Sequence, residues 1–207
     1  MAHTPIDPPL FSRPMSPEES VHPEHTIATP LVRRVRYDRL SPMFHDVTPY
    51  PLAAILRSHT TATFTCAMKL GVGLIDARLR DWLHNGDLHI GKLLDINSAI
   101  HVDLVVSDAL RMNMGYSTDP VDEVEPSVII ASNNVVASDV VAVALMRRYK
   151  TVRVVDKPTR EHEQFRHARR LGLGSPSLDD IELKAVDLVG DSSFSDLVEY
   201  VMDELED

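Results

Sequence analysis

Short β-branched runs alternate with longer helical patterns through the second half of the chain. Residues 102–106 and 127–131 are apolar, β-branched runs of the kind found in strands buried on both faces, and we expect both to be parallel strands. After the second run, residues 132–134 (Ser-Asn-Asn) offer candidates for a helix N-cap, and an apolar pattern continues over 135–146 to a pair of arginines. This strand, cap and helix unit is the clearest structural pattern in the sequence.

The alternation continues to the end of the chain. The pattern predicts strands at 151–155 and 181–189 and helices at 160–171 and 194–205, the first helix ending at Gly172. Alternating strands and helices indicate an α/β fold, with a mostly parallel or mixed sheet and helices packed on its faces.

The first half of the chain has weaker patterns. A proline followed by Leu-Ala-Ala-Ile-Leu predicts a short helix at 51–56, and alternating hydroxyl and apolar side chains favour a strand at 61–66. Two helices, at 79–83 and 90–100, are expected on either side of the turn-forming residues 85–87.

The N-terminal part of the chain is rich in proline. Residues 1–30 contain seven prolines without a sustained apolar period, which is typical of an extended or disordered arm. Residues 31–37 mix valine with arginine and suit an edge strand. We therefore expect an N-terminal arm over 1–30 and an α/β domain over 31–207.

The charge balance and the cysteine content exclude several classes of function. Asp and Glu outnumber Lys and Arg by 31 to 21, so the chain has no general attraction for phosphate backbones and nucleic acid is not an expected partner. A single cysteine, Cys66, excludes an internal disulfide and any cysteine-only metal or iron–sulfur site within the chain. No apolar run is long enough to span a bilayer, so we expect a soluble, cytoplasmic protein without a membrane partner.

Three polar residues follow or interrupt apolar segments in the α/β pattern. Asp139 has apolar neighbours three and four positions away, so it either faces a polar cleft, has a dedicated partner, or points outward beside Ser138. Asp108 and Asn133 come just after predicted strands, where ligands gather in open α/β sheets, although both residue types also cap and turn the local backbone.

A second polar group precedes these strands. His59, Thr61 and Lys69 belong to an eleven-residue segment with one imidazole, four hydroxyls and one amine, which suits an anionic ligand. The alternative is that the threonines line an exposed sheet face and the lysine is solvated. Histidines 84, 89 and 101 lack the spacing of a metal pair on one helix, so a metal site stays unknown.

Several short motifs, in a fixed order, resemble those of domain-of-unknown-function family 362. They are His59-Thr60-Thr61, Ala67-Met68-Lys69-Leu70-Gly71, the segment 103–108, the segment 132–139 and Arg170-Leu171-Gly172-Leu173-Gly174. The resemblance covers about residues 50 to 190 and implies that His59, Lys69, Asp108, Asn133 and Asp139 line one cleft.

The chain also departs from the family pattern. Leu70 stands where the family often has asparagine, and Asn134 where it often has aspartate. The ferredoxin-like cysteine motifs of many members are absent, so the resemblance implies no iron–sulfur cofactor here. A proline-rich lead replaces the additional α/β portion with which the family usually begins, as in a shortened homologue with an exposed sheet edge.

Two hypotheses follow, and neither settles whether the chain is an enzyme. In the first, the protein binds a small anionic or metal-linked ligand in a redox-associated or maturation role. Lys69 and His59 then meet the negative charge, and Asp108 and Asp139 supply a base or metal ligands. In the second, the chain is a non-catalytic scaffold or a truncated homologue without its own activity, and it docks a protein partner or a second copy through its arm or an open sheet edge.

Overall fold

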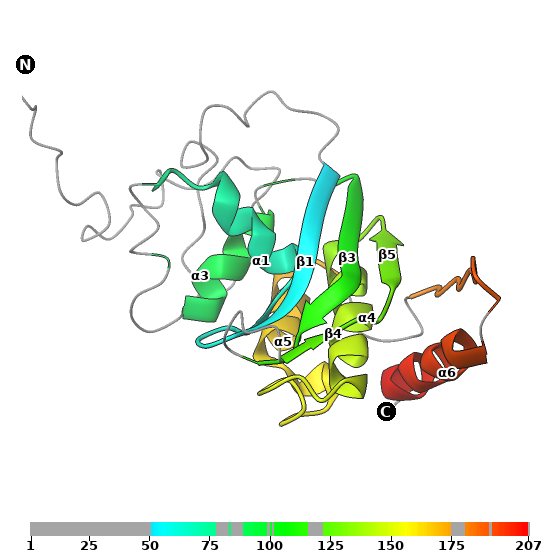
Figure 1. Cartoon of the computed structure of the whole chain (residues 1–207). Coiled ribbons are helices and arrows are strands. Elements are labelled where there is room, and N and C mark those ends of the chain that lie inside the picture. The colour runs from blue at the N-terminus through cyan, green and yellow to red at the C-terminus, as the bar shows by residue number, and fades with distance from the viewer. Residues whose placement is uncertain are drawn as a thin grey trace, which may run out of the picture.

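The computed structural model describes residues 51–77, 83, 89–98, 100, 102–115, 122–174, 181–190 and 192–206. The expected arm over 1–30 and the expected edge strand over 31–37 lie outside these residues. Within them the chain forms a mixed five-stranded sheet with helices, which confirms the predicted α/β class (Figure 1).

The sheet is built around one long central strand. The strands are β1 (Pro51–His59), β2 (Thr63–Thr65), β3 (Leu104–Asn113), β4 (Glu123–Val124) and β5 (Val128–Ser132). β3 pairs in parallel with β1, which pairs antiparallel with β2, while β4 and β5 both pair antiparallel with β3. The expectation that 102–106 and 127–131 are both parallel strands is therefore wrong for the second, because β5 runs opposite to β3.

The predicted helix at 51–56 is wrong, because these residues lie in β1. Leu52, Ala54 and Leu56 are buried on one side of the strand, and Ala53 and Ile55 are exposed on the other. The run Leu-Ala-Ala-Ile-Leu is apolar on both sides, so its pattern does not separate a helix from a strand. Parallel pairing with β3, over fifty residues away in sequence, decides the outcome.

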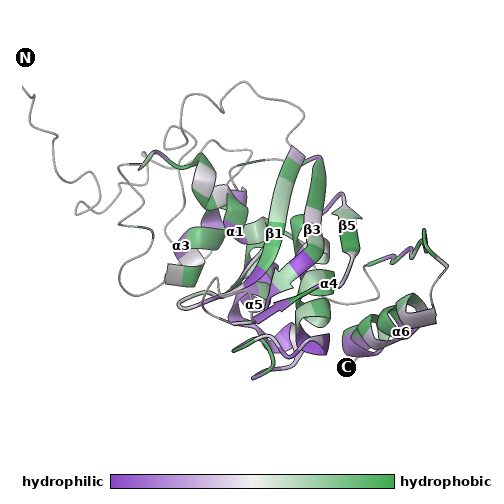
Figure 2. Cartoon of the chain, viewed as in Figure 1, coloured by the Kyte–Doolittle hydropathy of each residue, from purple (hydrophilic) through white to green (hydrophobic). Residues whose placement is uncertain are grey.

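The predicted strand, cap and helix unit is confirmed in β5 and α4 (Val135–Arg148). Asn134 is the N-cap: its Oδ1 accepts hydrogen bonds from the backbone N–H of Val136 at 2.8 Å and of Ala137 at 3.0 Å. Most of α4 is buried, in agreement with the mostly hydrophobic (green) colouring of its ribbon in Figure 2.

The other helices pack on α4 or on its neighbours. They are α1 (Ala67–Leu70), α3 (His89–Asp95), α5 (Glu163–Leu171) and α6 (Ser192–Glu206), with short 3-10 turns at Gly71–Leu74, Ile96–Ser98 and Thr159–Glu161. Figure 1 shows α4 and α5 behind the strands and α1 beside β1, while α6 packs on α4. The main core fills the space between this layer and the inner face of the sheet.

The helix predicted at 160–171 is confirmed in α5, and that at 194–205 in α6. Gly172 ends α5 with a φ of 70°, a left-handed conformation that glycine adopts without steric cost. In the middle of the chain, α3 and the following 3-10 turn replace the helix expected at 90–100. Of the helix expected at 79–83, the structure describes Leu83 alone.

Two other predicted strands are wrong. At 151–155 the backbone forms turns: Arg153 has a φ of 64°, and the carbonyl of Thr151 accepts from the N–H groups of Val154 and Val155. Residues 181–190 form no strand or helix, although Ile181 and Leu183 pack against the core. Both segments have alternating apolar and polar side chains, but neither pairs with a strand of the sheet. Alternation without a pairing partner is therefore not sufficient to form a strand.

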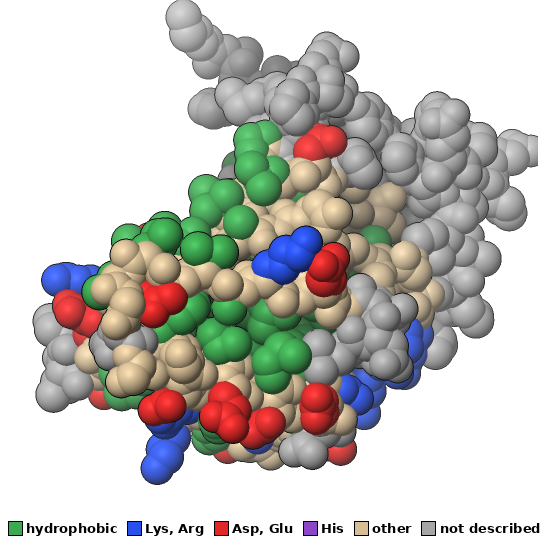
Figure 3. Space-filling model, turned by 90° about the vertical axis from the view of Figure 1, so that its right-hand side faces the viewer, with side chains coloured by type: hydrophobic (Ala, Val, Ile, Leu, Met, Phe, Trp, Pro, Cys, Tyr) green, Lys and Arg blue, Asp and Glu red, His purple; other side chains and the backbone are tan. Residues whose placement is uncertain are grey.

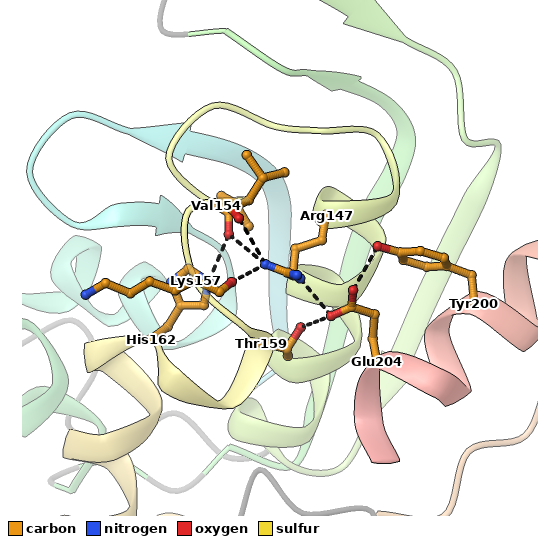
Figure 4. A network of polar contacts seen from close by, with 8 residues as sticks. Arg147, Val154, Lys157, Thr159, His162, Tyr200 and Glu204 are labelled. Carbon is orange, nitrogen blue, oxygen red and sulfur yellow. Dashed lines mark hydrogen bonds and ion pairs between the residues drawn. The ribbon is translucent and has the colours of Figure 1, made fainter. Parts of the chain in front are cut away.

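A polar network attaches α6 to α4 (Figure 4). Arg147 Nε donates to Glu204 Oε2 at 2.7 Å, and Glu204 also accepts from the hydroxyls of Thr159 at 3.0 Å and Tyr200 at 2.8 Å. The Arg147 guanidinium also donates to the backbone carbonyl of Lys157. Helix α6 and the loop after α4 are thereby held by one arginine.

Opposing effects act on the Glu204 carboxyl. Burial raises its pKa, but hydrogen bonds from Arg147, Tyr200 and Thr159 outweigh burial, and the net pKa lies below the ordinary value. The contribution of this carboxylate to stability is therefore present above its ordinary pKa and is lost as the pH falls through the lowered one.

Replacing Glu204 with glutamine is expected to loosen α6. Glu204→Gln removes the charge that the guanidinium binds, so we expect faster amide hydrogen exchange in α6 than in α4, and a loss of about 1–3 kcal/mol in the free energy of unfolding. Glu206→Gln, on the exposed end of the same helix, is the matched control. Equal exchange of α6 in both variants would contradict the role of the network.

Candidate functional site

Asp139 lies at the centre of the polar residues beneath the sheet. Its side chain is fully buried, and it accepts two backbone hydrogen bonds: Ala67 N–H donates to Oδ1 at 2.7 Å, and Met68 N–H to Oδ2 at 3.0 Å. The carboxylate, from α4, thus caps the first turn of α1, where N–H groups lack partners within the helix. Both carboxylate oxygens of Asp139 therefore have a structural role in positioning α1.

Burial dominates the ionisation of this carboxyl. It raises the pKa of Asp139 to about 7, although hydrogen bonds from Met68, from the Cys66 thiol and from Ala67 act in the opposite direction. The carboxylate is therefore held by its donors in a site that water does not reach.

A chain of small polar side chains continues from this carboxylate to β3. The thiol of Cys66 contacts Ser107 Oγ at 3.5 Å, and Ser107 Oγ lies 2.9 Å from Ser138 Oγ. All three side chains are buried, and burial together with Asp139 raises the pKa of the Cys66 thiol well above its usual range. This cluster links the start of α1, β3 and α4, and the protonated thiol in it is a poor nucleophile.

Lys69 follows directly after the capped N–H groups but does not pair with Asp139. Its half-buried ammonium has a lowered pKa, because burial disfavours the charge and because Arg57 lies close enough to repel it. Within the described residues, neither Lys69 nor Arg57 forms an ion pair. Two cations therefore approach each other near β2, whose Thr65 is the register partner of Arg57.

His59 and Thr61 shape the turn between β1 and β2. His59 Nδ1 accepts from the N–H groups of Thr61 at 3.3 Å and Ala62 at 3.2 Å, so the imidazole closes the turn on its own backbone. Arg153 also donates to the carbonyl of Thr60 in this turn. The predicted ligand-binding residues His59 and Thr61 thus lie together in the β1–β2 turn, and the hydrogen bonds of His59 described here stabilise that turn.

Asp108 and Asn133 lie elsewhere. β3 continues to Asn113, so Asp108 lies within the strand and not after it, on the face opposite to Ser107 and Asp139. Its Oδ1 accepts from the N–H of Leu110 at 2.9 Å. Asn133 is exposed beside the N-cap residue. The structure therefore brings Lys69 near the backbone that Asp139 caps, but it does not bring Asp108 or Asn133 to the same place.

The outer face of the sheet carries apolar residues that sequence reasoning did not select. Ile55, Leu104, Leu110 and Ile129 are 63%, 44%, 48% and 59% exposed, and they come from three adjacent strands. Asp108 pairs with Ile55 on β1 and with Ile129 on β5, so both flank it on the same face. We call this surface, with Ala53 and Val106 between its large residues, the outer face.

A sequence pattern could have located the outer face. β1 has apolar residues at consecutive positions, as do β3 and β5, and such runs are typical of strands covered on both sides. In the described residues, helices cover one side only (Figure 1).

Other exposed hydrophobic residues lie on the segment between α5 and α6. Val186, Leu188 and Val189 are 69%, 90% and 89% exposed. Figure 3, which looks from the side of β5 and α6 in Figure 1, shows hydrophobic patches separated by charged side chains. These three residues provide exposed apolar positions outside the strands of the outer face for comparison.

A second buried polar pair joins α3 to α5. His167 Nε2 lies 3.4 Å from Asp95 Oδ1, and both side chains are nearly inaccessible. Burial raises the pKa of Asp95, and the hydrogen bond and charge of His167 act against it. Gly91 faces this imidazole, and a Cβ there would lie 3.2 Å from His167 Cε1, so the close approach of the two helices depends on a glycine.

The described part of the chain contains no group of three His, Cys, Asp or Glu side chains placed to hold a metal ion. Within the same residues, no helix has the length and hydrophobicity needed to cross a membrane.

In the part of the chain that the structure describes, these features define an α/β fold whose sheet has helices on one face and none on the other. Residues 52–144, from β1 into α4, match the model of a family described as Domain of unknown function (DUF362). The match confirms the resemblance drawn from the motifs over residues 52–144. No curated protein and no solved structure matches the chain.

Asparagine at position 139 is expected to destabilise the fold. Asp139→Asn keeps the shape but leaves one of the two N–H groups facing an amide nitrogen, so we expect a loss of about 1–3 kcal/mol in the free energy of unfolding at pH 5, measured by denaturant titration.

The size of this loss is expected to depend on pH. The folded pKa of Asp139, about 7, exceeds the ordinary value of 3.8, so the carboxyl contributes most stability below pH 4 and less as the pH rises to 7. The difference between wild type and Asp139→Asn should therefore be smaller at pH 8 than at pH 5. The exposed Asp203→Asn is the control; a difference that grows with pH would contradict the raised pKa.

Proposed function

We propose that the chain is a non-catalytic docking module that binds a polypeptide on the outer face of its sheet. The observation that carries this proposal is the set of four large, exposed hydrophobic residues, Ile55, Leu104, Leu110 and Ile129, on one face of three adjacent strands. Contiguous exposed apolar surface of this kind is typical of interaction sites.

The energetics favour coverage of this face. Each square ångström of apolar surface removed from water contributes roughly 25 cal/mol, so a partner gains affinity from side chains that already stand in a fixed array. The strands hold these side chains without a disorder-to-order step, which lowers the entropic cost of binding.

The placement of the charged residues gives less support to catalysis. Both oxygens of Asp139 are occupied by backbone N–H groups, and Asp108 stands on the opposite face of the sheet. A reaction that used both carboxylates on one substrate would have to reach through the sheet. A docking role requires neither of them to move.

A single charge on the outer face is expected to abolish docking. A displayed library of random octapeptides should be enriched on the wild-type chain but not on Ile129→Glu, because a buried, unpaired carboxylate is costly. Val186→Glu is the matched control: it also replaces a large exposed hydrophobic residue, on the segment between α5 and α6 and outside the strands of the outer face. Equal enrichment on Ile129→Glu and wild type would contradict the proposal.

A second candidate function is the binding of a small anion near β2. The observation that favours it is the approach of Lys69 and Arg57, two cations that repel each other and form no ion pair within the described residues. A phosphate or carboxylate between them would neutralise both charges and remove the repulsion. This candidate keeps the anionic ligand but needs no catalytic carboxylate.

Phosphate is expected to stabilise the wild-type chain through Lys69. A thermal unfolding series in phosphate, against chloride at equal ionic strength, should raise the melting temperature of wild type more than that of Lys69→Met, because the general stabilising effect of phosphate acts on both and site binding acts on wild type alone. Lys184→Met, at a lysine whose side chain is 79% exposed, is the control and should respond as wild type does. Stabilisation of Lys69→Met equal to that of wild type would remove this candidate.

A further inference from the structure

The centre of the outer face carries a single carboxylate. Asp108 lies between Ile55 and Ile129 in the register of the sheet, and one of its oxygens accepts from the N–H of Leu110. The second oxygen has no hydrogen-bond partner within the described residues. Arg111, further along β3, is engaged by Glu125 at 3.1 Å.

This carboxylate restricts what can cover the face. Any apolar partner buries Asp108, and burial of an unpaired carboxylate is costly unless a cation accompanies it. A second copy of the chain, stacked face to face about a two-fold axis, would bring a second Asp108 carboxylate toward the first. The face therefore selects a segment in which a basic residue stands among apolar ones.

The chain itself contains a segment of this composition. Residues 31–37 read Leu-Val-Arg-Arg-Val-Arg-Tyr, with three arginines and no acidic residue in a chain whose net charge is −10. An arginine can bind a carboxylate through two parallel hydrogen bonds, while the valines, leucine and tyrosine supply apolar contacts.

The connection to the sheet is long enough. Residues 38–50 join this segment to Pro51, the first residue of β1, which is exposed and pairs with Leu104 at one end of the outer face. Thirteen residues span at most about 45 Å. The outer face extends roughly 20 Å along β3 from Leu104 to Leu110.

We propose that residues 31–37 of the same chain dock on the outer face, with an arginine paired to Asp108, and compete there with external polypeptides. This inference rests on the proposed docking function and assigns its regulation. A short linker gives the segment a local concentration on the order of millimolar, so external partners must outcompete it or displace it.

The test uses the full chain and a labelled synthetic peptide with the sequence of residues 31–37. The triple variant Arg33→Glu, Arg34→Glu, Arg36→Glu removes the internal competitor, so the peptide should bind it at least about tenfold more tightly than wild type, as measured by fluorescence anisotropy. Adding Asp108→Lys to the triple variant should abolish this binding. Arg13→Glu, at an arginine outside the segment, is the control and should behave as wild type.

The outcomes separate this inference from the proposed function. Equal peptide affinity for wild type and the triple variant, or no binding to either, would overturn the inference even if Ile129→Glu still abolished binding of library peptides. A dimer in solution that Ile129→Glu dissociates would also overturn it, because a second copy would then be the occupant. If library peptides were enriched equally on wild type and Ile129→Glu, or on neither, the proposed docking function itself would be contradicted.

Discussion

The two hydrogen bonds that Asp139 accepts hold together the parts of the molecule on which the remaining structure depends. They join α4, which follows β5, to the first turn of α1, which follows β2. A four-residue helix has few internal hydrogen bonds of its own, so its position depends on a cap supplied from elsewhere in the chain. The carboxylate is costly to bury, and that cost ties the packing of α4 to the correct placement of residues 66–68.

The strands of the sheet have a composition suited to coverage on both faces, but helices cover only one face in the described residues. These strands are apolar on both sides, and among the same residues the face without helices meets solvent. Water contact with isolated apolar residues is ordinary, but four large ones on adjacent strands form a surface that gains free energy when covered. The single carboxylate among them adds selectivity, because it penalises partners that lack a complementary charge.

The sequence predicted those parts of the fold that local chemistry determines. Asn134 with the apolar run of α4, and Gly172 at the end of α5, are cases in which one side chain or one backbone conformation decides the boundary. The strand β1 was missed because its residues suit a helix equally well, and only its pairing with β3 fixes its state. The strand prediction for residues 151–155 is wrong for the converse reason: the side chains suit a strand, but the segment pairs with no other strand.

The candidate site shows the same division. A buried Asp139 with a dedicated partner was one of the alternatives that its apolar neighbours allowed, but the partner is backbone, and no side-chain pattern announces a backbone donor. Asp108 was placed after a strand because the apolar run seemed to end there, whereas β3 continues for five more residues. The outer face could be recognised only when three strands from separate parts of the chain were set side by side.

The burial of Cys66 has a practical consequence. The one thiol of the chain is inaccessible and, with a raised pKa, remains protonated at neutral pH, so maleimide and iodoacetamide reagents react with it slowly. A cysteine introduced at an exposed position can therefore carry a spin label or a fluorophore while the native thiol stays in place. Spectroscopy of surface movements then requires no change to the polar cluster that supports α1.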